Sequence, residues 1–533
     1  MRRLRLVIVA VAASAMILSM TGVSQAATVT ESDVSPAAAH FPQNKQNESP
    51  MAINPVDASN IISGANDEIQ EPDCTPSTGG SSSCPFVFGV DTTGVYVTTN
   101  AGVNWTQTIL DYCPNNDPTD PNCLVVSDGD PVVTFGPKPD GKGGFSYASG
   151  ARAYFAGLVS SVSGTADSEW VAVSYSDDKG ATWSDPIIVP STRGPRNFND
   201  KPAIWADQDP ASPFFGNVYV SWTLFTGTFP GPSLVREGPV FLPEPIAVSV
   251  STDGSMTWSG AKRLSASHNN GAVGGRQFSS IRSAPNGDVY VIWDGAVDRR
   301  SAIVAARSTD GGQRWSRPFL VSFKSDIPSP LPGSSFRNNS GPMADIGPDG
   351  SIYVTWADYD FDAGHGVLKL ATSSNGGATW NVSTVADVAG RTPFYPAVAV
   401  SGSNVFIGFN ALDDVPEGTA PGAGVVLYDA YYVLSTNSGG TFGAPAKISA
   451  APSDPDVATA NSLTAQFIGD YNGADASTDG TFWFSWTDTR NGATCTAVDD
   501  WRASGFMTTK PNIYDSCPAG FGDSDIFVAS VTP

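Results

Sequence analysis

Basic residues and histidines are scarce in this chain. It has 29 lysines and arginines against 52 aspartates and glutamates, a formal net charge of −23, and only 3 histidines in 533 residues. Nucleic acid and anionic membranes repel a negative surplus of this size, so the sequence excludes both as partners. With so few histidines, all scattered, a zinc site is not expected. We expect no cofactor and leave open only a structural calcium ion.

Long apolar runs are missing after the N-terminus. Arg2, Arg3 and Arg5 precede an apolar run from Leu6 to Met20, and Ser24-Gln25-Ala26 follows as a cleavage site. The pattern predicts a secretory signal peptide over residues 1–26, the alternative being an uncleaved anchor with a run that is short for a bilayer. We therefore expect a secreted, extracellular monomer that does not insert into membranes.

Cysteine is also rare, and its spacing is informative. The six cysteines form three close pairs: Cys74 and Cys84, Cys113 and Cys123, Cys495 and Cys517. Six cysteines allow 15 pairings, and sequence alone does not choose among them. Because an exported chain meets oxidising conditions, three local disulfides that staple loops are the favoured arrangement.

Charged residues make up only 15% of the chain, whereas glycine (54) and proline (41) are abundant. This composition favours tight turns and short strands over long helices. We expect essentially no helix beyond the signal segment.

One octapeptide recurs through the chain. It reads STDGGQRW at residues 308–315, and its variants are SDDKGATW at 176–183, STDGSMTW at 251–258, SSNGGATW at 373–380, STNSGGTF at 435–442 and the weaker TTNAGVNW at 98–105. The Asp or Asn can accept hydrogen bonds from amides in its own turn, and the Gly permits a left-handed backbone. The Trp is large enough to wedge between neighbouring sheets. These are the needs of a hairpin, so we interpret the repeat as structural, with a repeated calcium or sugar site as the alternative.

The octapeptide closes a longer repeat of four short strands. Seven such units open near Pro50, Pro131, Pro202, Phe278, Pro342, Pro396 and Phe467. The period predicts an all-β fold, a seven-bladed β-propeller of four-stranded antiparallel blades, as one domain over residues 47–533. The last unit lacks a fourth strand. The N-terminal segment at 27–46, with a strand near Thr28–Val34, is expected to complete it.

Together, the repeats resemble the Asp-box (bacterial neuraminidase repeat) propellers, a group that includes the sialidases. The resemblance covers nearly the whole mature chain and implies a sialidase-like glycoside hydrolase acting on carbohydrate or glycoconjugate. Sialidases hold the substrate carboxylate with three arginines, use a tyrosine nucleophile polarised by a Glu, and use an Asp as general acid/base. By position, Tyr471 in FIGDYNG is the matching tyrosine, and Arg276, Arg337 and Arg391 could form the arginine cluster.

We expect the site on the face opposite the octapeptides, before first strands and after second strands. Polar residues before first strands include Asn47, Glu48, Asp128, Asp130, Asn199, Asp200, Arg276, Arg337, Arg391, Tyr395, Asp470 and Tyr471. Those after second strands include Asn66, Asp67, Asp294, Asp358, Asp413, Asp488 and Arg490. From these we predict the catalytic residues Tyr471, Asp488, Asp470 and Asp200. The predicted substrate-binding residues are Arg276, Arg337, Arg391 and Arg490.

The chain also departs from the sialidase pattern. It has no arginine between Arg5 and Arg152, it offers Asp488 in place of the glutamate, and it repeats seven times where sialidases have six blades. Two further hypotheses therefore stay open: a non-catalytic glycan-binding or cell-surface propeller, and a scaffold whose acidic pit binds calcium. Two carboxylates about 5–10 Å apart would favour hydrolysis, and a cage of six or more oxygens would favour calcium.

Overall fold

The computed structural model describes residues 27–35, 40–76, 82–84, 86–87, 89–113, 123, 125–161, 169–191, 197–226, 244–265, 277–338, 341–422 and 425–533. The predicted signal peptide, residues 1–26, lies outside these ranges. Within them, neither helix has the length of apolar chain that a membrane crossing requires.

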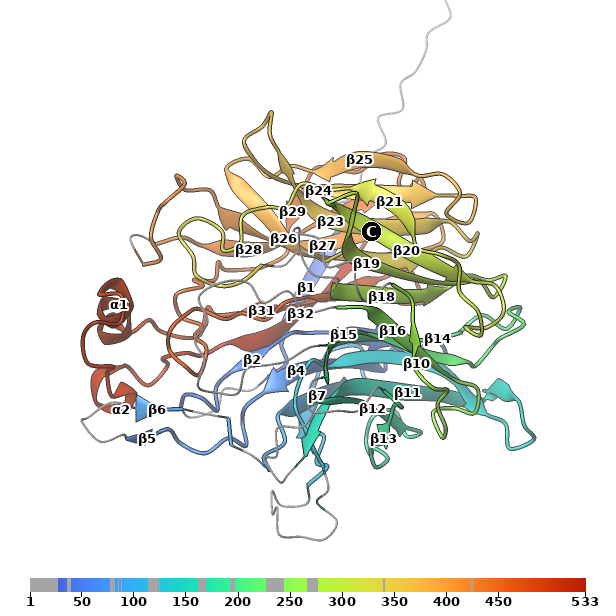
Figure 1. The fold of residues 1–533 in the computed structure, drawn as a ribbon, viewed down its shortest axis with the longest axis horizontal. Helices are drawn as coiled ribbons and strands as arrows, with labels where there is room; N and C mark the ends of the chain where they lie inside the picture. The colour runs from blue at the N-terminus through green and yellow to red at the C-terminus, as the bar shows by residue number, and fades with distance from the viewer. Residues whose placement is uncertain are drawn as a thin grey trace, which may run out of the picture.

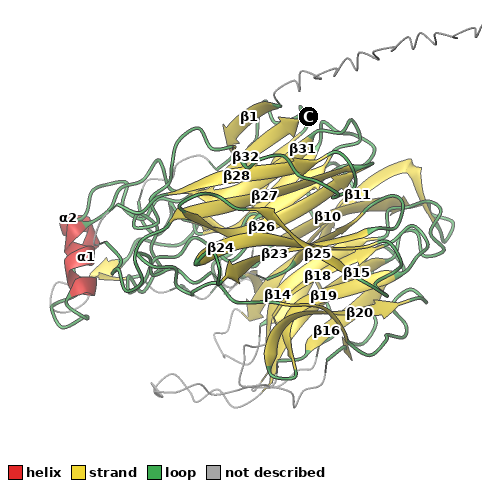
Figure 2. Cartoon of the chain, turned by 90° about the horizontal axis from the view of Figure 1, so that it is seen from above, coloured by secondary structure: helices red, strands yellow, loops and turns green. Residues whose placement is uncertain are grey.

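The described chain forms a seven-bladed β-propeller, as the repeat count predicts (Figures 1 and 2). The first blade contains β2 (Gln46–Asn47), β3 (Met51–Ile53), β4 (Ile61–Asp67), β7 (Thr93–Thr98) and β8 (Thr106–Ile109). The second contains β9 (Val125–Ser127), β10 (Val132–Pro139), β11 (Phe145–Ser161), β12 (Trp170–Ser176) and β13 (Ile187–Ile188). The third contains β14 (Asn197–Ala206), β15 (Val218–Thr226), β16 (Ile246–Ser251) and β17 (Lys262–Arg263). The fourth contains β18 (Gln277–Ser283), β19 (Val289–Val297), β20 (Arg300–Ser308) and β21 (Phe319–Phe323).

The remaining three blades follow the same antiparallel order. The fifth contains β22 (Met343–Ile346), β23 (Ile352–Asp360), β24 (His365–Ser373) and β25 (Asn381–Ala386). The sixth contains β26 (Arg391–Ser401), β27 (Asn404–Asp413), β28 (Tyr428–Ser435) and β29 (Ala446–Lys447). The seventh contains β30 (Gly473–Ala476), β31 (Phe482–Asp488), β32 (Asp525–Thr532) and β1 (Thr28–Asp33).

The ring is closed at its axis and within its last blade. Each inner strand contacts the inner strand of the next blade all the way round, including β30 against β3. In the last blade, β1 pairs antiparallel with β32 from Thr28 opposite Thr532 to Asp33 opposite Phe527. The N-terminal segment therefore supplies the fourth strand, and first and last segments of the chain share one sheet.

The hydrophobic core lies between blades. Trp222, Trp293, Trp356 and Trp486, each on the second strand of its blade, are fully buried. The octapeptide tryptophans pack into the same seams: Trp183 lies against a cluster drawn from the first and second blades, and Trp258 against one from the second and third. Stacking of blades thus buries both faces of each sheet.

The octapeptide turns are held by their own side chains. In the copy at residues 251–258, Ser251 Oγ donates to Asp253 Oδ1 (2.8 Å), the Ser255 amide donates to Ser251 Oγ (2.9 Å), and the Thr257 amide donates to Asp253 Oδ1 (2.9 Å). The copies that start at Thr98, Ser176, Ser308, Ser373 and Ser435 repeat these bonds. Every bond stays within eight residues, which agrees with a structural role for the repeat.

Three disulfides join the cysteine pairs that the spacing favours, Cys74–Cys84, Cys113–Cys123 and Cys495–Cys517. The first and third belong to one cluster with Phe41 and Trp501. The expectation of no helix is wrong in this region, because the segment between β31 and β32 contains α1 (Thr496–Ala503) and α2 (Ile513–Ser516). Both helices lie on the same side of the ring as β5 (Thr75–Pro76) and β6 (Ser82–Ser83), and α2 is next to β6 (Figure 1).

Candidate functional site

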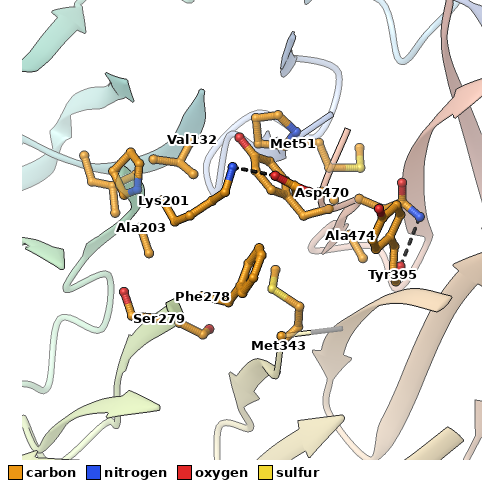
Figure 3. A pocket seen from close by; sticks show the side chains of 18 of the residues that line it. Met51, Val132, Lys201, Ala203, Phe278, Ser279, Met343, Tyr395, Asp470 and Ala474 are labelled. Carbon is orange, nitrogen blue, oxygen red and sulfur yellow. Dashed lines mark hydrogen bonds and ion pairs between the residues drawn. The ribbon is translucent and has the colours of Figure 1, made fainter. Parts of the chain in front are cut away.

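Five residues at or just before inner strands have a left-handed backbone. They are Glu48, Asp130, Lys201, Phe278 and Tyr395, with φ of 62°, 49°, 52°, 55° and 46°. This conformation is unfavourable for a residue with a Cβ atom and persists where the surroundings enforce it, often at functional sites. At the last three, the strand register shifts. All three line a cavity of about 110 Å³ that inner strands of all seven blades surround, which we call the axial cavity (Figure 3).

Lys201 is the centre of a buried ionic cluster. Its Nζ lies 2.6 Å from Asp470 Oδ2, 3.3 Å from Asp130 Oδ2, 3.6 Å from Glu48 Oε1 and 3.8 Å from Asp200 Oδ1. The lysine is only 6% exposed. Residues of blades one, two, three and seven thus meet at one ammonium group, and we call these five residues the lysine cluster.

Arg337 adds a second cation at the edge of this cluster. Its Nε and Nη2 hold Asp470 Oδ1 and Oδ2 at 2.7 and 2.5 Å, a bidentate arrangement. Burial alone would raise the pKa of Asp470, but Lys201 and Arg337 outweigh it, so the pKa lies below its ordinary value. Asp470 therefore stays ionised and fixes both cations.

The other carboxyl groups of the lysine cluster divide into protonated and ionised members. Burial raises the pKa of Glu48 well above its ordinary value and that of Asp200 to about 8, in both cases despite Lys201. Asp130 is also buried, but Lys201 and a hydrogen bond from Asp200 outweigh burial and hold its pKa well below the usual range. At neutral pH, Glu48 and Asp200 therefore keep their protons, and Lys201, Arg337, Asp130 and Asp470 balance in charge.

Lys201 also lines a larger cavity of about 680 Å³, which we call the acidic cavity. Three cations line it: Lys45, Lys201 and Arg337. Seven carboxyl side chains line it: Glu48, Glu68, Glu71, Asp128, Asp130, Glu169 and Asp200. Burial raises the pKa of Glu169 and Asp128 above the ordinary value. It also raises the pKa of Glu71, to about 7. The cavity therefore combines protonated and ionised carboxyls, which acid–base chemistry requires.

The wall on the side of the first blade is rigid and partly aromatic. Lys45 Nζ donates to Glu68 Oε1 at 2.6 Å and to Asn461, and Asn461 Nδ2 donates to Glu68 Oε2 at 2.7 Å. Phe86, close to the Cys74–Cys84 disulfide, also lines the cavity and is 59% exposed. An exposed aromatic ring beside buried polar groups is typical of a ligand-binding surface.

The structure brings together four of the eight predicted catalytic and substrate-binding residues. Asp200, Asp470 and Arg337 belong to or contact the lysine cluster. Tyr471 lines the axial cavity, and its hydroxyl donates to the Pro131 carbonyl at 2.7 Å. Burial, followed by the charges of Glu48 and Asp130, raises the pKa of Tyr471 well above its ordinary value. This shift is the opposite of what a phenolate nucleophile needs.

The other predicted residues do not join this group. Asp488 accepts both guanidinium bonds of Arg490, at 2.9 and 2.6 Å, and Arg490 also holds Glu31 of β1 at 2.6 Å. Arg391 pairs with Asp413 and Asp429 at 2.8 and 2.9 Å. These arginines are occupied in blade-stabilising ion pairs, so the expected convergence of all eight residues is wrong for Asp488, Arg490 and Arg391. Arg276 lies outside the described residues.

Lys201, Glu169 and Lys45 were not among the predicted site residues. Lys201 precedes Pro202 as Asp130 precedes Pro131, so the shared position before the proline was an available signal. Glu169 directly precedes β12, in the connection after the second strand of its blade, which is one of the two places where the site was expected. In the part of the chain that the structure describes, no three acidic, histidine or cysteine side chains are placed to hold a metal ion.

Stability is expected to fall as the pH rises from 5 to 8. Burial raises the pKa of Asp200 and Asp525 to about 8 and that of Asp475 to about 7, so the folded chain keeps protons that the unfolded chain has already lost. Carboxyls with a lowered pKa change the stability only below pH 5. One of them is Asp310, whose pKa is lowered to about 2 by its hydrogen bond from Arg314. The urea midpoint should decrease between pH 5 and pH 8, and less so in Asp200→Asn. A midpoint that increases over this range would contradict the assignment.

No protein-family model matches this chain, and no curated protein matches it. Similar solved structures include a Hadza microbial sialidase, with 13% identity and a TM-score of 0.40 over 68% of this chain and 63% of that one. A leech intramolecular trans-sialidase has 11% identity and a TM-score of 0.39 over 72% and 67% of the two chains. The GH93 α-L-arabinofuranosidase of Fusarium graminearum has 14% identity and a TM-score of 0.35 over 63% and 92%. Likenesses this distant carry no information about activity.

Proposed function

We propose that this protein is a secreted glycoside hydrolase that acts on extracellular glycans in the acidic cavity. The observation that carries the proposal is the mixture of protonated and ionised carboxyls around Lys201. Glycoside hydrolysis needs one carboxyl that donates a proton and one carboxylate that acts as base or nucleophile. The three disulfides and the signal peptide predicted at residues 1–26 support export.

Four carboxyl groups have a proposed role. Because Asp200 and Asp130 hydrogen-bond to each other, they titrate as one unit that holds a proton and a negative charge. Glu169 lines the same cavity with a raised pKa and is the second proton donor. Lys201 and Asp470 are positioning residues, since they hold the Asp130–Asp200 unit in place. This assignment favours carboxyl chemistry over a tyrosine nucleophile.

A sialidase mechanism is less well supported. Of the predicted arginine cluster, only Arg337 reaches the acidic cavity among the described residues, and Asp470 already occupies its guanidinium fork. The three cations of the cavity are already paired with carboxyl groups, so none is free to hold the carboxylate of an anionic sugar. We therefore propose a neutral or cationic glycan as substrate.

The experiment is a screen of the purified protein against chromogenic glycosides, sialosides included. We expect turnover of at least one asialo substrate, and a decrease in kcat of about 10²–10⁴-fold in Asp200→Asn and in Glu169→Gln. Asp362→Asn is the control, because this aspartate is exposed on the turn between β23 and β24. Unchanged turnover in both cavity variants would remove the assignment.

The second candidate is a non-catalytic glycan-binding propeller, and exposed Phe86 in the cavity wall favours it. An aromatic ring can pack against the apolar face of a sugar without any chemistry. Glycan binding that Phe86→Ala weakens, with no turnover of any glycoside, would establish this function instead.

A further inference from the structure

We propose that the acidic cavity selects a glycan that carries a free, protonated amino group, an unacetylated amino sugar. The proposal rests on the proposed function, since it names the substrate class of the same cavity. It follows from how the cations and carboxyls of the cavity are paired, from a buried carboxyl that lacks donors, and from an exposed aromatic ring.

The cavity's three cations are already satisfied by carboxylates. Lys45 is held by Glu68 at 2.6 Å, Arg337 by Asp470 at 2.5 Å, and Lys201 lies within 4 Å of four carboxyl groups. Asp128 and Glu169 line the cavity with no ion-pair partner among the described residues. The cavity wall that they form, which we call the carboxyl wall, therefore presents carboxyl groups with which no cation of the described protein pairs.

Buried oxygens in the same cavity lack hydrogen-bond donors. Glu48 is fully buried, and within the described part of the chain neither of its carboxyl oxygens has a donor within hydrogen-bond distance. Oε2 of Glu169 is buried in the same way. An unpaired buried polar group costs free energy, so such groups point to a ligand that supplies donors. An ammonium group offers three N–H donors and a positive charge.

Phe86 indicates a sugar rather than a bare cation. Its ring is 59% exposed and lines the same cavity as the carboxyl wall. A pyranose can pack its C–H face on such a ring while its polar substituents reach the carboxyl groups. A calcium ion would use only the oxygens and would leave this ring without a role.

Binding of an ammonium group has a proton signature. The groups that act on Glu169 are Asp128, Asp130, Asp200 and Lys201, and burial first raises its pKa well above the ordinary value. A ligand cation favours the ionised carboxylate, so Glu169 and Asp200 should release protons when the ligand binds at pH 7. A neutral sugar that only hydrogen-bonds to these groups would leave their protons in place.

The test is calorimetry of the full chain with a tetramer of β-1,4-linked glucosamine and with its N-acetylated counterpart. We expect the amino form to bind at least about tenfold more tightly and to release protons, which is read from the difference between two buffers of unequal ionisation enthalpy. Glu169→Gln should remove most of the preference, Phe86→Ala should weaken both ligands alike, and Asp362→Asn should change neither.

Each outcome decides the proposal. Equal or tighter binding of the N-acetylated tetramer overturns it, as does calcium chloride that displaces the amino tetramer at micromolar concentration. Hydrolysis of a chromogenic glycoside with no binding of the amino tetramer overturns the amino selectivity and leaves the hydrolase assignment standing. Tight binding of the amino tetramer without turnover supports the selectivity and refutes the hydrolase. Thermal unfolding of each variant identifies any variant that fails to fold. Phe86 is exposed, so Phe86→Ala should fold and can still test the site if a buried variant does not.

Discussion

Replacing Lys201 by methionine is expected to lower the free energy of unfolding by about 3–5 kcal/mol, because it leaves buried carboxylates without their counter-charge. Asp470 is only 2% exposed and lies 2.6 Å from the ammonium, and Asp130 accepts from both the ammonium and the backbone amide of Lys201. Methionine keeps an unbranched apolar stem that is one atom shorter, so the loss reports mainly charge rather than packing. The measurement is urea unfolding at pH 7.

The matched control is Lys179→Met. Lys179 pairs with Asp57 at 2.7 Å, but its side chain is 53% exposed, so water already screens the pair. Its loss should cost less than about 1 kcal/mol. The deficit of the Lys201 variant should also shrink at pH 5, since carboxylates that lose their cation become easier to protonate. A loss below about 1 kcal/mol in the Lys201 variant would mean that the lysine does not anchor the cluster.

Removing the closing strand β1 is expected to destabilise the fold by about 3–6 kcal/mol, from lost core burial and backbone hydrogen bonds together. Six residue pairs join β1 to β32, and Val34 beyond them is only 2% exposed. Loss of β1 also removes the ion pair between Glu31 and Arg490 and leaves β32 as an exposed sheet edge. The comparison is a chain that begins at Ala27 against one that begins at Ser35, by thermal and urea unfolding.

Peptide complementation separates this effect from a general intolerance to truncation. A synthetic peptide of residues 27–34 should raise the melting temperature of the shortened chain in a concentration-dependent way, because it binds only the folded ring. A peptide with Val29 and Glu31 replaced by proline is the control, since proline donates no ladder hydrogen bond. Equal stability of the two chains would show that β1 does not close the ring.

The lysine cluster and the carboxyl wall have different roles in the site. The lysine cluster holds loops from four blades at one point, whereas the carboxyl wall at Asp128 and Glu169 is left without an ion-pair partner in the described chain. A cluster built around one shared cation favours rigidity, and a wall without ion pairs favours ligand binding. Substitutions in the cluster should therefore change stability first, and substitutions in the wall should change binding first.

The local parts of this protein can be predicted from its sequence. The octapeptide turns bond within eight residues, and the cysteine pairs lie 10, 10 and 22 residues apart, so both leave a pattern in the linear chain. Seven repeats of four strands predict seven blades for the same reason. The helices at Thr496–Ala503 and Ile513–Ser516 could not be predicted in this way, because they are too short to show a periodic pattern. Tertiary contacts stabilise them instead: the buried side chains of Val498 and Trp501, and the Cys495–Cys517 disulfide.

Only the tertiary structure decided which polar residues meet. Asp470 and Lys201 are 269 positions apart in the sequence and 2.6 Å apart in space. Asp488, by contrast, occupies an equally plausible place in the repeat but bonds to Arg490 two residues on. Repeat position brings a residue to the correct face, but the choice between a neighbour in the same blade and a partner across the axis depends on strand bulges and burial. These are properties of the assembled ring, and no single unit of the sequence carries them.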